Sequence, residues 1–258
     1  MSDRPATTGT PAARPEPGLP TIDVHEYGGK KGDERQTMNR RLFMQLLVFD
    51  VPVGSDLVQA RRELEEGLRK VNTKAVIYAD TNAVRGLGVL TWNEDPAHFV
   101  DRVAKVFERG ELAKVVERRE FAMLGRTYSS GHEPELEHAL LRRPIENVLH
   151  PHYGWHIWYP LRRTGAFATL DPHEQSIIMR EHASIGMAYG RQELAHDIRL
   201  ACHGLDANDN EFVIGIVGSE LHPLSHLVQT MRKTKQTSQF ITKMGPFFVG
   251  RVLTRVDA

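Results

Sequence analysis

The chain has 258 residues, in which 33 lysines and arginines balance 33 aspartates and glutamates. That length allows one large domain or two small ones, and the balanced charge excludes a global electrostatic attraction to nucleic acid or an anionic membrane. The single cysteine, Cys202, excludes an intrachain disulfide and fits a reducing compartment. No apolar run approaches the roughly 20 residues that span a bilayer, and the N-terminus lacks the apolar core of a secretory signal. We therefore expect a soluble, cytoplasmic protein.

Residues 1–37 are predicted to form a disordered tail. Prolines interrupt regular structure in its first part, at Pro5, Pro11, Pro15, Pro17 and Pro20. A strongly polar stretch from Gly28 to Arg35 follows, and it offers little apolar surface to bury. Regular structure is expected to begin near Arg41.

Residues 38–128 and 154–258 are predicted to form two halves, joined by a connecting segment at 129–153. In the first half, apolar periodicity indicates strands at 42–49, 75–78, 87–92 and 117–128 and helices at 57–71 and 95–107. In the second half it indicates strands at 156–159, 197–202, 211–217 and 246–253 and helices at 171–190 and 223–232. A short helix is expected at 135–141 in the connecting segment.

The two halves share details of sequence that indicate a duplication. Trp92–Pro96 and Gly218–Pro223 each join a strand to a helix, while Phe121–Arg126 and Phe247–Arg251 each end a half with an aromatic strand and Gly-Arg. The order β-α-β-β-α-β is the ferredoxin-like pattern. The predicted fold class is α+β, with two ferredoxin-like repeats forming a dimeric α+β barrel within one chain.

The helix at 171–190 carries a histidine on its apolar face. Asp171 suits the N-cap, and Glu174 is expected to complete a capping box. Apolar residues at helical spacing define one stripe, which comprises Ile178, His182, Ile185 and Tyr189. Gly186 lies on this stripe one turn after His182. Because glycine costs a helix roughly 1 kcal/mol relative to alanine, we expect that a flat cofactor needs the space.

Three segments in this order resemble the chlorite dismutase family: Trp158–Arg163, the helix with Met179-x-x-His182-x-x-x-Gly186-x-x-Tyr189, and Gly204–Phe212. The family includes chlorite dismutases and the coprohaem decarboxylases of bacterial haem synthesis, and the resemblance covers roughly residues 40–255. It implies that the C-terminal half binds haem b or coprohaem and that His182 is the iron ligand. It also implies assembly into rings, commonly pentamers.

The same resemblance suggests roles for other residues of the second half. Tyr159-Pro160 matches the decarboxylase tyrosine whose radical attacks a propionate. Arg163 matches by spacing the basic residue that holds a propionate, and Arg162 is the alternative. A guanidinium suits this role because its planar donors meet a carboxylate bidentately.

The chain departs from the family pattern on both sides of the expected porphyrin. On the distal side, counting back from Gly204 places Asp197 where chlorite dismutases have an arginine, with Arg199 nearby. Strand alternation puts Asp197 and Arg199 on one face and His196 on the other. On the proximal side the chain lacks the carboxylate that chlorite dismutases supply to the ligand histidine. Gln236 is expected to accept that hydrogen bond instead.

The resemblance implies a haem-dependent oxidoreductase closest to the coprohaem decarboxylases, whose partners are a porphyrin and a small oxidant, peroxide or chlorite. The alternatives are a chlorite dismutase or peroxidase with Arg199 as the distal arginine, and a haem-binding protein without catalysis. Each residue also has a structural interpretation. His182 could be a hydrogen-bonded core histidine, Tyr159 a tyrosine at the barrel rim, and Arg162 and Arg163 solvated charges at a strand end.

Overall fold

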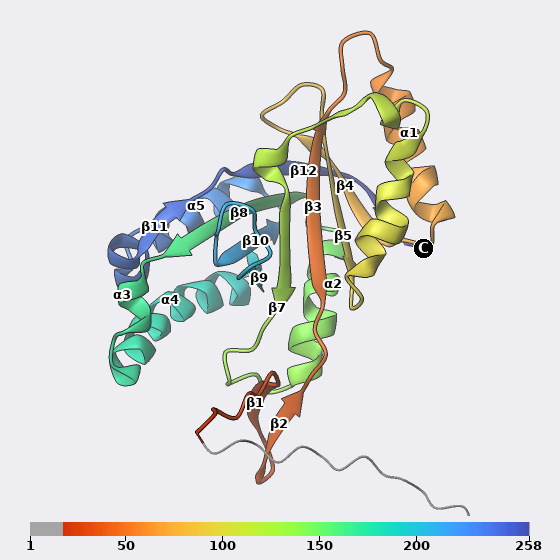
Figure 1. The fold of residues 1–258 in the computed structure, drawn as a ribbon. Coiled ribbons are helices and arrows are strands. Elements are labelled where there is room, and N and C mark those ends of the chain that lie inside the picture. The colour runs from red at the N-terminus through yellow and green to blue at the C-terminus, as the bar shows by residue number, and fades with distance from the viewer. Residues whose placement is uncertain (1–17, 258) are drawn as a thin grey trace, which may run out of the picture.

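The computed structural model describes residues 18–257, which form a mixed α+β fold with a 10-stranded sheet and a separate two-stranded hairpin (Figure 1). The strands are β1 (Glu26–Lys31), β2 (Glu34–Met38), β3 (Phe43–Asp50), β4 (Ala75–Asp80), β5 (Gly86–Asn93), β6 (Val116–Glu117), β7 (Met123–Thr127), β8 (Trp155–Arg163), β9 (His196–Ala201), β10 (Phe212–Gly218), β11 (Ile241–Met244) and β12 (Phe248–Val256). The α-helices are α1 (Leu57–Lys70), α2 (Arg143–Leu149), α3 (Gly165–Ala168), α4 (Pro172–Arg191) and α5 (Leu221–Met231). Shorter π- and 3₁₀-helical turns are η1 (Phe99–Val103), η2 (Ala104–Glu108), η3 (Leu112–Lys114), η4 (Arg119–Phe121), η5 (His138–Arg142) and η6 (Gln236–Phe240).

Strand pairing in the large sheet closes a ring. Neighbours follow the order β10, β9, β7, β3, β5, β4, β12 and β8, and β8 pairs again with β10. The first half contributes β7-β3-β5-β4 and the second β12-β8-β10-β9, so both halves have the order fourth, first, third, second along the chain. The halves meet where β7 pairs with β9 and where β4 pairs with β12.

The largest apolar core lies where side chains of both halves meet. Trp158, Tyr78 and Phe248 are fully buried in it. Gly215 makes room for the indole of Trp158, because a Cβ at this position would lie 2.5 Å from its ring. Burial of such aromatic rings is the main driving force that holds the two halves together.

Helices cover two other faces of the sheet, and each encloses its own apolar layer. α1 begins at the N-cap Asp56 and packs Ala60, Leu64 and Leu68 against the first half. α4 and α5 enclose a layer with β8, β10 and β12 of the second half (Figure 1). This second layer contains the helix of His182 and is therefore the place of the candidate site.

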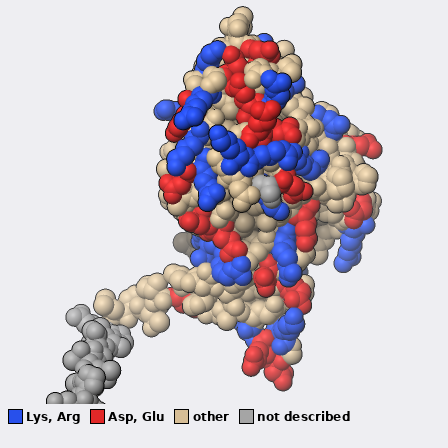
Figure 2. Space-filling model, turned by 90° about the vertical axis from the view of Figure 1, so that its right-hand side faces the viewer, with Lys and Arg blue, Asp and Glu red and all other residues tan. Residues whose placement is uncertain are grey.

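The face that carries α1 has charges of both signs interspersed (Figure 2). Pairs one turn apart on this helix, such as Arg69 with Glu65 at 3.0 Å, contribute to this pattern. A mixed surface of this kind gives no extended positive potential that would attract a polyanion to this face.

In residues 18–257, no helix combines the length and the apolar character that a membrane span requires.

The prediction of a disordered tail up to residue 37 is wrong for β1 and β2, which pair as an antiparallel hairpin. The Gly29 N–H donates to the Glu133 carbonyl at 2.8 Å, and the Gln36 side-chain amide donates to the Gly29 carbonyl at 3.1 Å. Polar contacts with the connecting segment thus replace an apolar face, so hydrophobic periodicity could not predict the hairpin. The earlier residues, 1–17, lie outside the described part of the chain.

Three other elements differ from their predicted form. The expected helix at 95–107 is a π-turn followed by a 3₁₀-turn, η1 and η2. The expected strand at 117–128 is interrupted by η4, and its long part begins only at Met123. The connecting helix runs over η5 and α2, from His138 to Leu149, with Pro144 near the junction of the π-helical and α-helical parts. The remaining predicted strands and helices are confirmed to within a few residues.

Candidate functional site

α4 positions His182 through its capped N-terminus. The Asp171 carboxylate accepts a hydrogen bond from the His173 N–H at 2.8 Å, as predicted for the N-cap. Glu174 instead makes an ion pair with Lys235 at 2.9 Å, so the expected capping box is replaced by a contact to the segment after α5. This contact ties the first turn of α4 to the residues near η6.

The predicted apolar stripe of α4 faces α5 and the sheet, but only Ile178 is fully buried in it. The hydroxyl of Tyr189 contacts the Thr230 hydroxyl at 3.2 Å and so joins α4 to α5. A Cβ on Gly186 would meet a single atom within 4 Å, the Cε of Met231 at 3.7 Å. A methyl group at this position would therefore make one ordinary contact and no clash.

The sheet presents a row of three side chains in this layer. Ile214 of β10 lies opposite Tyr159 of β8 on one side and Arg199 of β9 on the other. Because paired residues of antiparallel strands point to the same face, the three side chains share one face of the sheet. Asp197 lies two residues before Arg199 on this face, and its carboxylate is 3.0 Å from Nε of Arg199.

His182 lies close enough to these groups to respond to their charges. Burial and the positive charge of Arg199 lower the pKa of His182, and Asp197 partly opposes them. The imidazole is therefore neutral at neutral pH, the form that binds a metal ion. His196, by contrast, pairs with Glu193 at 3.1 Å and stacks on Tyr153, so it lies away from this group.

Among residues 18–257, the side chain that meets Nδ1 of His182 is Thr234, where the sequence predicts Gln236. Nδ1 of His182 lies 3.5 Å from Oγ1 of Thr234, which is 1% exposed. The side-chain oxygen of Gln236 is buried and has no hydrogen-bond partner within residues 18–257, so Gln236 does not accept the expected bond. The reason is local: Gln236 begins the π-helical turn η6, and Thr234 precedes that turn.

Tyr159 is buried and stacks on Phe247 with ring centroids 4.5 Å apart. Burial raises the pKa of Tyr159, Asp197 raises it further, and Arg232 lowers it. The phenol therefore keeps its proton over the physiological range, and its oxidation must release a proton together with an electron.

Arg162 and Arg163 point to opposite faces of β8, so they are not equivalent alternatives. Arg163 shares the face of Tyr159 and lies over the rings of Phe167 and Phe212, at 4.6 Å from each centroid. Its Nε is also 3.3 Å from the Glu211 carboxylate. On the other face of β8, the Arg162 guanidinium donates a hydrogen bond to the Asn208 carbonyl. Arg163 is thus on the correct face for a porphyrin contact but already has three partners.

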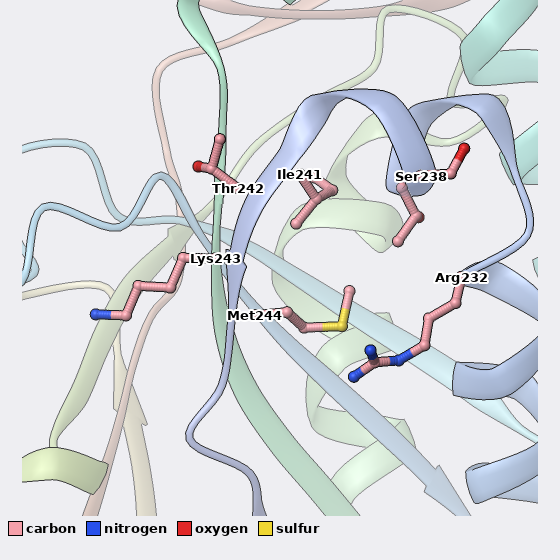
Figure 3. A pocket seen from close by; sticks show the side chains of 7 residues that line it. Arg232, Ser238, Ile241, Thr242, Lys243 and Met244 are labelled. Atoms are coloured by element: carbon pink, nitrogen blue, oxygen red, sulfur yellow. The ribbon is translucent and has the colours of Figure 1, made fainter.

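A pocket of about 340 Å³ opens beside this layer, lined by Arg232 at the end of α5, by Thr237 and Ser238, and by Ile241–Met244 of β11. Arg232 reaches toward Met244, while Lys243 points away (Figure 3). The pocket lies beside the end of β8, because β11 pairs with Leu161–Arg163 of that strand.

Comparison with known proteins identifies the family. The family model for chlorite dismutase matches residues 58–253, most of the chain. The chain belongs to the chlorite dismutase family. No curated protein sequence matches it.

Solved structures of this fold are similar over most of their length. A candidate chlorite dismutase matches with a TM-score of 0.67 and 15% identity, covering 83% of this chain and 96% of the other. A haem-binding protein from Thermus thermophilus matches with a TM-score of 0.65 and 18% identity, covering 83% and 92%. A mutant chlorite dismutase from Candidatus Nitrospira defluvii matches with a TM-score of 0.64 and 12% identity, covering 84% and 93%. At these identities the likeness shows the fold.

The sequence analysis of this chlorite dismutase family member missed three residues at the site. Thr234 and Arg232 lie in a basic run, Met231–Lys235, which resembles a solvated helix end. Tyr128 follows β7, and its ring is 5.5 Å from that of Phe212. Burial raises the pKa of Tyr128, and the positive charges of Arg199 and Arg163 oppose this shift. Each of the three reaches the site only through contacts between elements distant in sequence.

The histidines at 150, 152 and 156 do not form a metal site. Among residues 18–257, no three or more His, Cys, Asp or Glu side chains come together in a group that could hold an ion. His156 is buried in the core, where its Nδ1 lies 2.8 Å from the Tyr78 hydroxyl.

Proposed function

We propose that the chain binds an iron porphyrin, haem b or coprohaem, with His182 as the iron ligand, and catalyses a peroxide-driven oxidation closest to coprohaem decarboxylation. The observation that carries this proposal is the placement of the neutral His182 within reach of Arg199 and Asp197, in the layer where Tyr159 also lies. Family membership supports the cofactor class.

The residues present fit such a group. A neutral imidazole is a suitable iron ligand, and the light packing at Gly186, where a Cβ would meet only Met231 within 4 Å, supports a flat ring against α4. Apolar side chains such as Ile185, Ile214 and Met244 line the layer and suit a porphyrin face. When bound, the iron would supply the oxidising power that peroxide delivers.

Tyr159 would contribute the phenol that is oxidised. Each decarboxylation converts a propionate into a vinyl group with loss of CO₂ and one proton, and its two electrons reduce one peroxide to two water molecules. Because Tyr159 keeps its proton, it can take a hydrogen atom from the propionate after giving up one of its own. Stacking on Phe247 holds its ring in place for this transfer.

Arg232 and Arg163 are the two candidate propionate anchors on the Tyr159 side. Arg232 has an exposed guanidinium on the pocket and acts on Tyr159 electrostatically. Arg163 would have to exchange Glu211 for the propionate. We therefore propose Arg232, with the Ser238 hydroxyl on the same pocket, as one propionate anchor and Arg163 as a second.

The test is incubation of the purified protein with iron coproporphyrin and peroxide, followed by mass spectrometry of the porphyrin. The proposal predicts stepwise loss of two carboxyl groups and a product with the mass of haem b. Recovery of unchanged coprohaem after its Soret band has shown binding would reject the decarboxylase activity and leave haem binding in place.

A second function, chlorite dismutation or peroxidation, is favoured by Arg199. This arginine shares the face of Tyr159, and Asp197 and Tyr128 raise its pKa against the effect of burial, so it stays charged. A fixed positive charge there can hold an anionic oxidant. Oxygen evolution from chlorite that collapses in Arg199→Ala would establish this activity, and absence of oxygen would exclude it.

A third function, haem binding without catalysis, is favoured by the hydroxyl of Thr234, since no carboxylate makes the observed contact to Nδ1 of His182. Titration with haem distinguishes the classes. A Soret shift that is lost in His182→Ala supports ligation by this residue, and an equal shift in both proteins would overturn the whole assignment.

We also infer that the two halves are ferredoxin-like repeats, because they share one strand order and are joined edge to edge. The proposed boundaries of the first half, the connecting segment and the second half remain 38–128, 129–153 and 154–258.

We also propose that the protein forms a homo-oligomer, and the family favours a pentamer. Ile177 and Met187 are exposed apolar side chains on α4 that such contacts could cover. Light scattering on the purified protein measures the number of subunits in the assembly.

A further inference from the structure

We propose that Thr234 is a positioning residue that fixes the tautomer of His182, so that hydrogen resides on Nδ1 and Nε2 is free to bind iron. The inference rests on the proposed iron porphyrin for its consequence, but the tautomer itself is a property of the protein alone. In this proposal the Thr234 hydroxyl accepts the hydrogen bond from the ligand histidine that a carboxylate accepts in chlorite dismutases.

The hydrogen bonds of the Thr234 hydroxyl determine the direction of the bond to His182. Oγ1 lies 2.8 Å from the Met231 carbonyl oxygen, 3.3 Å from the Thr237 N–H nitrogen and 3.5 Å from Nδ1 of His182. A hydroxyl has one proton to donate and two lone pairs. Because a carbonyl only accepts and an amide only donates, the proton goes to Met231 and one lone pair accepts from Thr237.

The second lone pair of Oγ1 then has two possible donors, the Thr237 hydroxyl at 3.2 Å and Nδ1 of His182 at 3.5 Å, and we infer that Nδ1 is the donor and carries the hydrogen. In the neutral imidazole this leaves Nε2 with the free lone pair. Iron-ligating histidines depend on such a partner for their ring orientation. The separation of 3.5 Å is long, and we expect it to shorten when Nε2 is bound, as bonds within unliganded sites commonly do.

Two acids of α4 hold Thr234 in this place. The neighbouring residue, Lys235, gives its ammonium group to Glu174 at 2.9 Å and its backbone N–H to Glu181 at 3.0 Å. Lys235 therefore acts as a bridge that fastens the turn before η6 to the helix of His182. These two contacts hold Thr234 next to the imidazole of His182.

The choice of a hydroxyl has a chemical consequence. A neutral hydroxyl accepts a weaker hydrogen bond than a carboxylate does, so His182 donates less electron density to the iron. The ferric state is then stabilised less, and the reduction potential lies higher than with an acid at this position. This protein would therefore hold its iron with a less basic histidine than a chlorite dismutase does.

The first experiment uses the protein without porphyrin. Nitrogen-15 NMR of the imidazole ring measures which nitrogen of His182 carries hydrogen. We expect the Nδ1–H form to dominate in the wild type and in Thr234→Ser, and a mixture of tautomers in Thr234→Val. Thr237→Val removes the other hydroxyl that can donate to Thr234, so the Nδ1–H form should stay dominant in that variant. An unchanged tautomer in Thr234→Val would overturn the proposal.

The second experiment adds iron porphyrin. We expect Thr234→Val to bind it about 10-fold more weakly, the lower end of the range for removing such a partner, and Thr234→Ser to restore the affinity. Thr234→Asp should lower the reduction potential and raise the iron–histidine stretching frequency. Failure of the wild type to bind would reject the proposed function. Binding with equal affinity in Thr234→Val and Thr234→Ser would reject only the role of Thr234.

Discussion

Tyr159 and Arg199 lie in one row of the sheet, each directly opposite Ile214 of the strand between them. The row places a phenol and a guanidinium on the face that α4 covers, where Arg199 also lowers the pKa of His182. Their positions are set by the pairing of three antiparallel strands, and a shift of one residue in either pairing would send one of them to the opposite face.

Tyr159→Phe should separate the proposed chemistry from binding. The substitution keeps the ring that stacks on Phe247 and removes only the hydroxyl, so we expect a stability change of about 1 kcal/mol or less. The porphyrin affinity should stay within about 2-fold, while conversion of coprohaem to the vinyl product should be abolished. Product formation by Tyr159→Phe at the wild-type rate would exclude Tyr159 as the radical residue.

Gly186 should tolerate a methyl group but no larger side chain when porphyrin is bound. In Gly186→Ala the new Cβ meets only Met231 at 3.7 Å, so the better helix propensity of alanine should raise the free energy of unfolding by up to about 1 kcal/mol. Gly186→Leu should fold as well but lose porphyrin binding, because its side chain enters the space beside His182. Thermal melts and Soret titrations of both variants check this. Full binding by Gly186→Leu would show that the porphyrin lies elsewhere.

Arg232 and Arg163 should behave differently when each is replaced by leucine. Arg232 is exposed, so Arg232→Leu should change stability by no more than about 0.5 kcal/mol while weakening coprohaem binding about 10-fold. Arg163→Leu loses two aromatic contacts and the Glu211 pair, and should cost roughly 1–2 kcal/mol of stability. Urea denaturation and porphyrin titration measure the two effects. If only Arg163→Leu weakened binding, Arg163 would be the principal anchor.

His156 should make the protein acid-sensitive. Burial lowers the pKa of His156 to about 3 in the folded state. In the unfolded state the imidazole takes up a proton below about pH 6.5, so between these two pH values only the unfolded state is protonated. The folded state therefore has its full stability above pH 6.5 and loses it progressively as the pH falls toward 3. Between pH 6.5 and 5 this group alone should cost roughly 2 kcal/mol of unfolding free energy.

The matched variant for this prediction is His156→Gln, which keeps an acceptor for the Tyr78 hydroxyl but does not titrate. The unfolding free energy of the variant, measured in urea at several pH values, should fall less between pH 6.5 and 5 than that of the wild type. The difference between the two falls should be roughly 2 kcal/mol. Parallel curves for the two proteins would show that His156 does not cause the acid sensitivity.

The sequence by itself determined the elements whose signals are local. The N-cap Asp171, the spacing from Ile178 to Tyr189 and the alternation around Asp197 and Arg199 correctly predicted a helix and a strand face. Those signals are sufficient because helix capping and side-chain alternation depend on residues a few positions apart. The mixed α+β fold and the family follow from the same patterns.

The tertiary structure decided everything that depends on contacts between distant segments. The hairpin of β1 and β2 is held by Glu133, about a hundred residues later, and no apolar pattern announces it. Thr234 rather than Gln236 meets His182 because Lys235 is fastened to α4. The sequence predicted His182 as the candidate ligand, but the packing of distant segments determines which side chains contact it. A hydrogen bond between residues 52 positions apart leaves no pattern in the local sequence.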